Sequence, residues 1–518
     1  MSPQEWFEKL QELFHAETRE KWEDGKERPR DPAPRNKHLD TLWSYYCGDA
    51  PLPQVSAEYQ DVFRDIMRKS RSNPSEMCVS AVVARMELHG VATGVDKSAN
   101  GDDLANQIME DSGFAAQFKD IEVFKSAMGE SYGLVVKHPP GSGLKPTIHA
   151  IDPRRCVGVE DPLIPSRLKA ALIKEFDVER NRSIAHMYLP GGRRWLIDTD
   201  PETGKYQDVP DEPTETITGI DELGGIPVVK FANPLGMGEY EGHIDVLDRL
   251  IDITLQSLIL MRFQAMRPTA VMGDDPEDED EYDTEDTDPA DMWQPPAHPD
   301  AVDRPHANQK SMSDVLKAGP GEVWKLPERW KVWQGAPGDV QGILGAKRDT
   351  VKEFATGTHT PLYLIAPDDA SGSATGAEVL REALTSKVRD RRSRDTVSLK
   401  LLWRLAFAMA GEKGRGDVVK LRWGPIEFKS LTEKASATQG AKGTLSRRRM
   451  QREIWDMPDE DIAENEAELE QEALLAQARA AALAALTQAQ SPQQNATGGQ
   501  QDDPADVTDT GDDAANAA

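Results

Sequence analysis

Residues 241–266 read EGHIDVLDRLIDITLQSLILMRFQAM, and this stretch sets the plan of the chain. Acidic residues crowd its start and basic residues its end, which suits the dipole of a helix. About 26 residues predict a helix of about 39 Å. Its apolar residues recur at the three- and four-residue spacing of a helix that buries one face. They are Ile244, Leu247, Ile251, Leu255 and Leu258.

Three further segments complete the block that this helix begins. Residues 340–357 predict a second helix, and residues 367–376, PDDASGSATG, predict a loop of small and polar residues. Residues 377–410 contain neither proline nor glycine, which predicts a helix of about 51 Å. Two helices that flank an inserted segment, followed by a small-residue loop and a long helix, are an unusual arrangement for an enzyme. They suit a subunit that lines a channel.

The inserted segment between the first two helices is strongly acidic. Residues 274–291 hold 12 acidic residues among 18, a composition that predicts a mobile, solvated insert. Short strands are expected on either side of it, at 269–272 and 331–334. A calcium loop would need a glycine at its sixth position, and this insert supplies none.

Composition limits the classes of function. The 518 residues suffice for about three domains, and the net charge of −29 is opposite in sign to that of most free nucleic-acid-binding proteins. Cys47, Cys78 and Cys156 are too few and too scattered for a disulfide framework or a metal site. We expect no membrane span, because no apolar run reaches about 18 residues.

The remaining sequence predicts an α+β fold that is mainly helical. Apolar spacing changes from the helical period to an alternating one after residue 128, and the last residues, 488–518, have the composition of a disordered tail. Helices are expected at 3–22, 75–88, 102–113, 115–128, 446–455 and 459–483, and strands at 132–138, 147–151, 169–177, 184–188, 195–197, 226–231 and 418–428.

Few patterns in the chain could carry catalysis. Residues 129–133, GESYG, match the nucleophile elbow of serine hydrolases, with Ser131 as the nucleophile. An elbow needs a strand before the serine and a helix after it, whereas here a helix is expected before and a strand after. No phosphate-binding loop and no H-E-x-x-H occurs. We therefore expect no enzyme activity, no cofactor and no metal, so any energy-consuming step is driven by a partner.

Two groups of residues could contact a polymer or another subunit. The first half of the long helix is basic, and its arginines could touch phosphates or pair with acids of a neighbouring subunit; they are Arg389, Arg391, Arg392 and Arg394. The loop before that helix could let DNA pass without bulky side chains, or be a plain surface connection. Its candidate residues are Asp368, Asp369, Ser371, Gly372, Ser373 and Thr375.

In the order of its parts, the chain from residue 42 to 457 resembles the portal proteins of tailed bacteriophages, of the type found in long-tailed phages. The resemblance rests on a series of short features. They are YYCGDAPL at 45–52, the helix start at Asn73, YGLVV at 132–136, NPLG at 233–236, RPT at 267–269, PGEVWKLP at 320–327, TPLYL at 360–364 and SGS at 371–373.

The resemblance implies a division of the chain into the parts of a portal subunit. By this similarity, the parts are an N-terminal arm and α+β wing (1–240), stem helix 1 (241–268), a clip (269–338) with a disordered acidic insert (274–310), stem helix 2 (339–358), a tunnel loop region (359–376), a spine helix with returning wing strands (377–430), a helical crown (431–487) and a disordered tail (488–518). Compact clips are typical of the family, so the acidic insert is a departure. The clip would dock partners through Trp324, Trp330 and Trp333.

The resemblance also implies partners and a location. The expected assembly is a ring of twelve copies at one capsid vertex, through which double-stranded DNA is packaged and ejected. The terminase large subunit, then a head-completion or adaptor protein, would dock on it, beside major capsid and scaffolding proteins. The chain would belong to the virion, after assembly in the host cytoplasm. The alternatives are a serine hydrolase that uses Ser131 and another head or scaffold-associated structural protein.

Overall fold

A computed structural model describes residues 1–16, 34–53, 57–95, 101–139, 141–265, 269–272, 331–334, 340–365, 374–426, 431–455, 457 and 459–489. The chain divides into two compact units, Met1–Gly440 and Ala441–Ala518. The mixed α+β content agrees with the predicted fold class.

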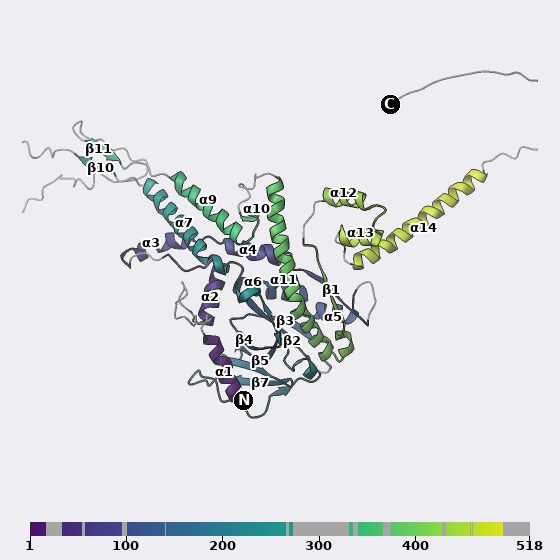
Figure 1. The fold of residues 1–518 in the computed structure, drawn as a ribbon, viewed down its shortest axis with the longest axis horizontal. Helices are drawn as coiled ribbons and strands as arrows, with labels where there is room; N and C mark the ends of the chain where they lie inside the picture. The colour runs from purple at the N-terminus through teal and green to yellow at the C-terminus, as the bar shows by residue number, and fades with distance from the viewer. Residues whose placement is uncertain are drawn as a thin grey trace, which may run out of the picture. The chain divides into compact units, whose positions relative to one another are not determined.

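The first unit is built on an antiparallel sheet of eight strands (Figure 1). Strands β3, β2, β9, β5, β6, β7 and β8 follow one another in space, and β4 also pairs with β5. Consecutive apolar residues bury both faces of β5, where Ala171 and Ile173 belong to one core and Ala170 and Leu172 to another. The bounds are β2 Glu130–Val136, β3 Thr147–Ile151, β4 Cys156–Asp161, β5 Ile164–Asp177, β6 Arg182–Leu189, β7 Arg193–Asp198, β8 Glu215–Thr216 and β9 Val228–Ala232.

Helices cover the sheet on both faces. One face packs against α5 (Asp103–Ser112), α6 (Phe114–Met128) and the second half of α11 (Ala374–Met409), in a core that contains Trp403 and Phe407. The other face, at β4 to β7, packs against α1 (Pro3–His15). The sheet is therefore an enclosed layer, which gives α11 a rigid support.

A second core lies where α7 begins. It joins α2 (Arg35–Tyr46), α4 (Pro74–Val83), α6, the first turns of α7 (Ile244–Ala265) and Phe354 of α9 (Val340–Gly357). Helix α3 (Ala57–Ser70) packs against the middle of α7 through Ile66 and Met67.

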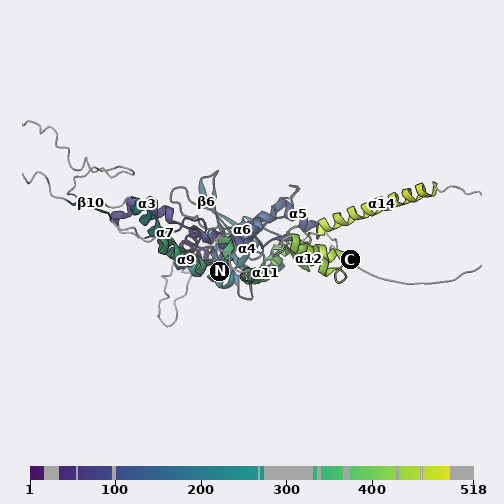
Figure 2. The same ribbon diagram turned by 90° about the horizontal axis from the view of Figure 1, so that it is seen from above.

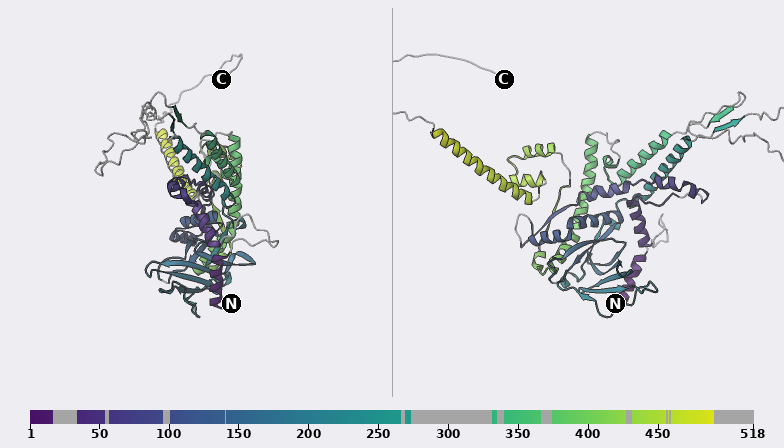
Figure 3. Two further views of the ribbon diagram at one scale, coloured as in Figure 1. Left: turned by 90° about the vertical axis from the view of Figure 1, so that its left-hand side faces the viewer. Right: turned by 180° about the vertical axis from the view of Figure 1, so that it is seen from behind.

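Helices α7 and α9 run side by side and lead to a two-stranded ladder, β10 (Thr269–Met272) with β11 (Lys331–Gln334) (Figures 1 and 3). Ala270 pairs with Trp333 in this antiparallel ladder, so the chain returns at residue 331 to the point that it left at residue 272. An ion pair between Arg249 and Glu353 links the two helices. The predicted helices and strands of this region therefore form one hairpin-like element.

Three helices complete the chain. Helix α12 (Leu431–Ala441) ends at the boundary between the units, and α13 (Arg447–Glu453) packs against α14 (Asp459–Ala489) in the second unit. Helix α14 is exposed over residues 471–483. It extends two residues into the segment predicted to be a disordered tail.

Several predictions of element bounds were wrong. The helix expected to reach residue 88 ends at Val83, and residues 88–93 form β1 (Leu88–Thr93), which pairs with β12 (Val419–Trp423). Strand β4 and helix α3 were not predicted. Helix α11 begins at Ala374, within the predicted loop.

Candidate functional site

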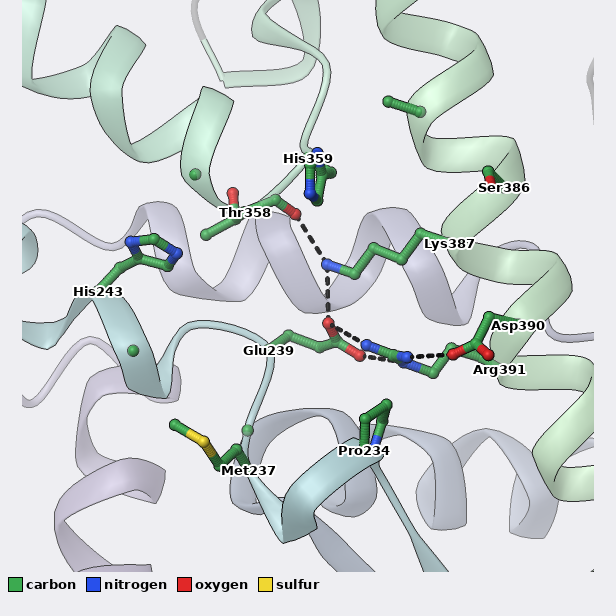
Figure 4. Close-up of a pocket in the computed structure, with 14 residues that line it drawn as sticks. Pro234, Met237, Glu239, His243, Thr358, His359, Ser386, Lys387, Asp390 and Arg391 are labelled. Carbon is green, nitrogen blue, oxygen red and sulfur yellow. Dashed lines mark hydrogen bonds and ion pairs between the residues drawn. The ribbon is translucent and has the colours of Figure 1, made fainter.

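The candidate site is a cavity of about 560 Å³ between the segment that precedes α7, the end of α9 and the helix α11 (Figure 4). Its floor carries the Glu239 cluster, which consists of Glu239, Lys387 and Arg391. Lys387 Nζ lies 2.7 Å from one Glu239 carboxylate oxygen. Arg391 donates to both oxygens, from Nε at 2.7 Å and from Nη2 at 3.1 Å. Lys387 also donates to the carbonyl oxygen of Thr358 at 2.8 Å.

The Glu239 cluster joins three elements that are distant in sequence. Glu239 precedes the 3-10 turn Glu241–His243 that leads into α7, Thr358 directly follows α9, and the two cations lie one turn apart on α11. Burial alone would raise the pKa of the Glu239 carboxyl, but Lys387 and Arg391 hold it below its usual value. Every charge at this joint has a partner, which suits a fixed connection better than a site that binds and releases substrate.

The backbone before Glu239 is fixed by close packing against the end of α6. The amide of Glu239 donates to the carbonyl oxygen of Ser126 at 2.7 Å. At Gly238 a Cβ would lie 2.4 Å from the carbonyl oxygen of Ala127, and at Gly129 it would lie 2.3 Å from that of Gly236. Only glycine allows the two chain segments to approach this closely.

A second ionic group, the Lys125 cluster, is buried between α6 and α11. Lys125 Nζ donates to Glu122 at 2.6 Å and also to Asp395, and all three side chains are at most 2% exposed. Burial and the nearby Asp395 charge raise the pKa of Glu122 to about 8. Burial alone would lower the pKa of Lys125, but the Asp395 and Glu122 carboxylates raise it above its usual value. Burial raises the pKa of Asp395 as well, so the two carboxyl groups that face the single Lys125 cation favour a shared proton between them.

A third group, the Glu130 cluster, lines a neighbouring cavity of about 770 Å³. Lys230 Nζ lies 2.8 Å from Glu130, and Arg35 pairs with the same carboxylate. Burial alone would raise the pKa of Glu130, but Arg35 and Lys230 lower it to about 2. Arg35 also donates to the carbonyl oxygens of Pro153 and Cys156, which fixes α2 against the sheet.

The four arginines predicted on the long helix have different environments. Arg391 belongs to the Glu239 cluster, and Arg392 is buried, where it donates to the carbonyl oxygens of Arg85 and Gly424. Arg394 pairs with Asp390 on the surface. Arg389 is exposed. Arg391, Arg392 and Arg394 thus have partners within their own chain, and contact with DNA or another subunit remains a prediction for the four arginines.

Most other predicted site residues lie outside the described residues. This holds for Asp368, Asp369, Ser371, Gly372 and Ser373 of the loop, and for Trp324 and Trp330. Trp333 lies in β11. Thr375 lies in α11, so its assignment to the loop was wrong.

The serine of the GESYG motif is not arranged for catalysis. Helix α6 precedes the motif and a strand follows that helix, as expected, but Ser131 itself lies within β2, where it is fully buried opposite Phe231. No substrate can reach it there. Among the described residues, no group of three or more His, Cys, Asp or Glu side chains could hold a metal ion. Within the same residues, no helix has the length and apolar character needed to span a membrane.

The residues that form the three clusters were not predicted as site residues, Arg391 apart. Glu239 and its cations are about 150 positions apart, and no local spacing relates them. A partial signal existed in α6, where Glu122 and Lys125 stand one turn apart in a helix whose other buried residues are apolar, Ser126 excepted.

Comparisons with known proteins gave matches among solved structures only. No family model matches the chain, and no curated protein matches it. A chain from the neck of a native gene transfer agent particle, computed with C12 symmetry, is 14% identical with a TM-score of 0.37, covering 80% of this chain and 98% of that one. A chain from the virion of a native gene transfer agent particle is 14% identical, with a TM-score of 0.34, and the match covers 81% of this chain and 99% of that one. A chain from the neck of an empty gene transfer agent particle, computed with C6 symmetry, is 15% identical, with a TM-score of 0.36, and the match covers 78% of this chain and 95% of that one.

Proposed function

We propose that this chain is a structural protein of a phage-like particle, and specifically its portal protein. Identical copies surround a channel at one vertex of the capsid, and double-stranded DNA passes through that channel during packaging and ejection. The ring is expected to contain twelve copies, as the sequence resemblance implies.

The observation that supports this proposal most directly is how the α7–α9 pair is attached. The pair leads away from the sheet to the β10–β11 ladder, and its base is fixed to α11 by the Glu239 cluster. A channel wall needs helices that stand apart from the body of the subunit and still keep their angle to it. Buried, fully paired charges on three elements fix that angle, because separating them would expose unpaired ions to an apolar surrounding.

The parts of the chain take distinct roles in this proposal. The sheet with its covering helices is the wing, α7 and α9 are the stem, and β10 with β11 begins the clip. The clip binds the terminase large subunit during packaging and a head-completion protein afterwards. The loop residues proposed to come close to the DNA are Asp368, Asp369, Ser371, Gly372 and Ser373. Helices α13 and α14 belong to the crown inside the head, near capsid and scaffolding proteins.

The acidic composition supports passage rather than retention of DNA. With a net charge of −29 per chain, a ring repels phosphates over most of its surface, so the duplex meets few points of strong attachment. A band-shift assay with the assembled ring at low salt measures this property. Tight, salt-sensitive binding of duplex DNA would contradict it.

Electron microscopy of the purified chain tests the proposal as a whole. We expect closed rings with a central hole at concentrations that support assembly. A single-chain species at those concentrations, or a compact multimer without a hole, would contradict it. The Glu239→Ala variant provides a matched sample in which the stem is loosened, and we expect its rings to be fewer or less regular.

A further inference from the structure

The turn before Glu239 presents an unusual leucine to the surface. Leu235 is 94% exposed and has a positive φ of 60°, a conformation that is strained for any residue with a Cβ. Hydrogen bonds fix the turn, because Asn233 donates to Gly129 and accepts from Gly236 through the main chain. A strained backbone that is held fixed while it exposes a large apolar side chain makes this turn a candidate for contact with another molecule.

A cavity lies on each side of this turn. Pro234 and Met237 line the cavity of about 560 Å³ above the Glu239 cluster, and Leu235 and Met237 line the cavity of about 770 Å³ at the Glu130 cluster. His359, a second exposed residue with a positive φ of 54°, lies at the first cavity. The Leu235 turn therefore stands between two depressions that could receive side chains from a partner.

The charges around the Leu235 turn make it suitable for contact with a second copy of this chain. Copies that each carry −29 repel one another, so they associate best where the local charge is balanced. Here Glu239 is matched by Lys387 and Arg391, and Glu130 by Arg35 and Lys230. With Asp390 at the first cavity and Glu241 at the second, each cavity has two acidic and two basic side chains, so the surface is close to neutral within an acidic protein.

A complementary apolar feature lies on the opposite face of the same unit. The turn between β5 and β6 projects away from the side that carries α9 and α11 (Figures 2 and 3). It exposes Phe176 by 55% and Val178 by 81%. The Asp177 carboxylate accepts from the amides of Glu179 and Arg180, at 3.0 and 3.1 Å, and so fixes the shape of the turn.

We propose that the β5–β6 turn of one copy docks on the Leu235 turn of the next copy, with Val178 and Phe176 against Leu235 and the two cavities. A closed ring needs two different surfaces on each copy, one for each neighbour, and these two surfaces lie on opposite faces. The inference rests on the proposed ring, since only a cyclic assembly brings opposite faces of successive copies together.

Disulfide trapping tests this contact. In a Cys47→Ser background, which removes the exposed native thiol, Leu235→Cys and Val178→Cys are combined in one chain and mildly oxidised. We expect a ladder of cross-linked species on a non-reducing gel, up to the full ring. An equal mixture of the two single variants should give dimers only, because each chain then has a single thiol at the contact. Leu163→Cys combined with Leu235→Cys is the matched control; Leu163 is 89% exposed at the other end of β5 and should give no ladder.

Imaging of the same samples separates the two proposals. Rings without a Leu235–Val178 ladder would overturn the contact and leave the proposed function intact. Dimers from the Leu235→Cys variant alone would overturn it too, because they would mean that like faces meet. If neither rings nor cross-links form, both proposals fail.

Discussion

Replacement of Glu239 by alanine tests whether the joint at the base of α7 is as strong as its geometry implies. Glu239 is 2% exposed, and it neutralises Lys387 and Arg391, which are 10% and 13% exposed. The variant leaves two cations buried without their carboxylate. Removal of one partner from such a buried group costs about 3–5 kcal/mol, and we expect a loss of that size in the free energy of unfolding.

The control is a carboxylate that also binds an arginine but lies in water. Glu353 pairs with Arg249 between α9 and α7, where the side chains are 57% and 47% exposed. Glu353→Ala should cost less than about 1 kcal/mol. Urea unfolding followed by circular dichroism, at concentrations below assembly, measures both variants. The reasoning would be refuted if Glu239→Ala shifted the midpoint no further than Glu353→Ala.

Three other predictions concern pH, packing and the loop. Burial raises the pKa of Glu122 from 4.5 to about 8, and it raises the pKa of Asp395 as well. The contribution of Glu122 to stability is therefore full below pH 4.5 and is lost as the pH rises through about 8. Melting temperatures across this range should show the loss, and Glu122→Gln should reduce it. Gly238→Ala should lower the free energy of unfolding by about 1–3 kcal/mol, because the added Cβ would meet the carbonyl oxygen of Ala127. Gly345→Ala, which has open space in α9, should raise it by up to about 1 kcal/mol. Equal effects of the two changes in urea unfolding would contradict this. Deletion of residues 371–376 should impair DNA packaging while rings still form, and loss of rings would identify the loop as a subunit interface.

Local patterns in the sequence correctly predicted the elements whose apolar residues recur with a clear period or whose pairing partners are near in the chain. Strands β3, β10 and β11 and helix α9 have the predicted bounds. Strand β1 was mistaken for the end of a helix because the strand that pairs with it, β12, lies more than 300 residues later. Its apolar residues continue those of α4, and only the distant partner makes them a strand.

The ionic clusters were beyond prediction for a related reason. A glutamate such as Glu239 looks like any charged residue at a helix start, and only tertiary packing brings Lys387 and Arg391 to it. The same applies to Lys125, whose partner Asp395 is 270 residues away. By contrast, the wrong context of the GESYG motif could be recognised from the sequence, because it depends on neighbouring elements alone.

The most direct test of the central claim is a cryo-electron microscopy map of the assembled particle. The account predicts a closed ring in which α7 and α9 of every copy stand around an open axis wide enough for duplex DNA, with β10 and β11 at one end. A particle in which these helices lie on the outer rim, or in which the axis is filled, would contradict it.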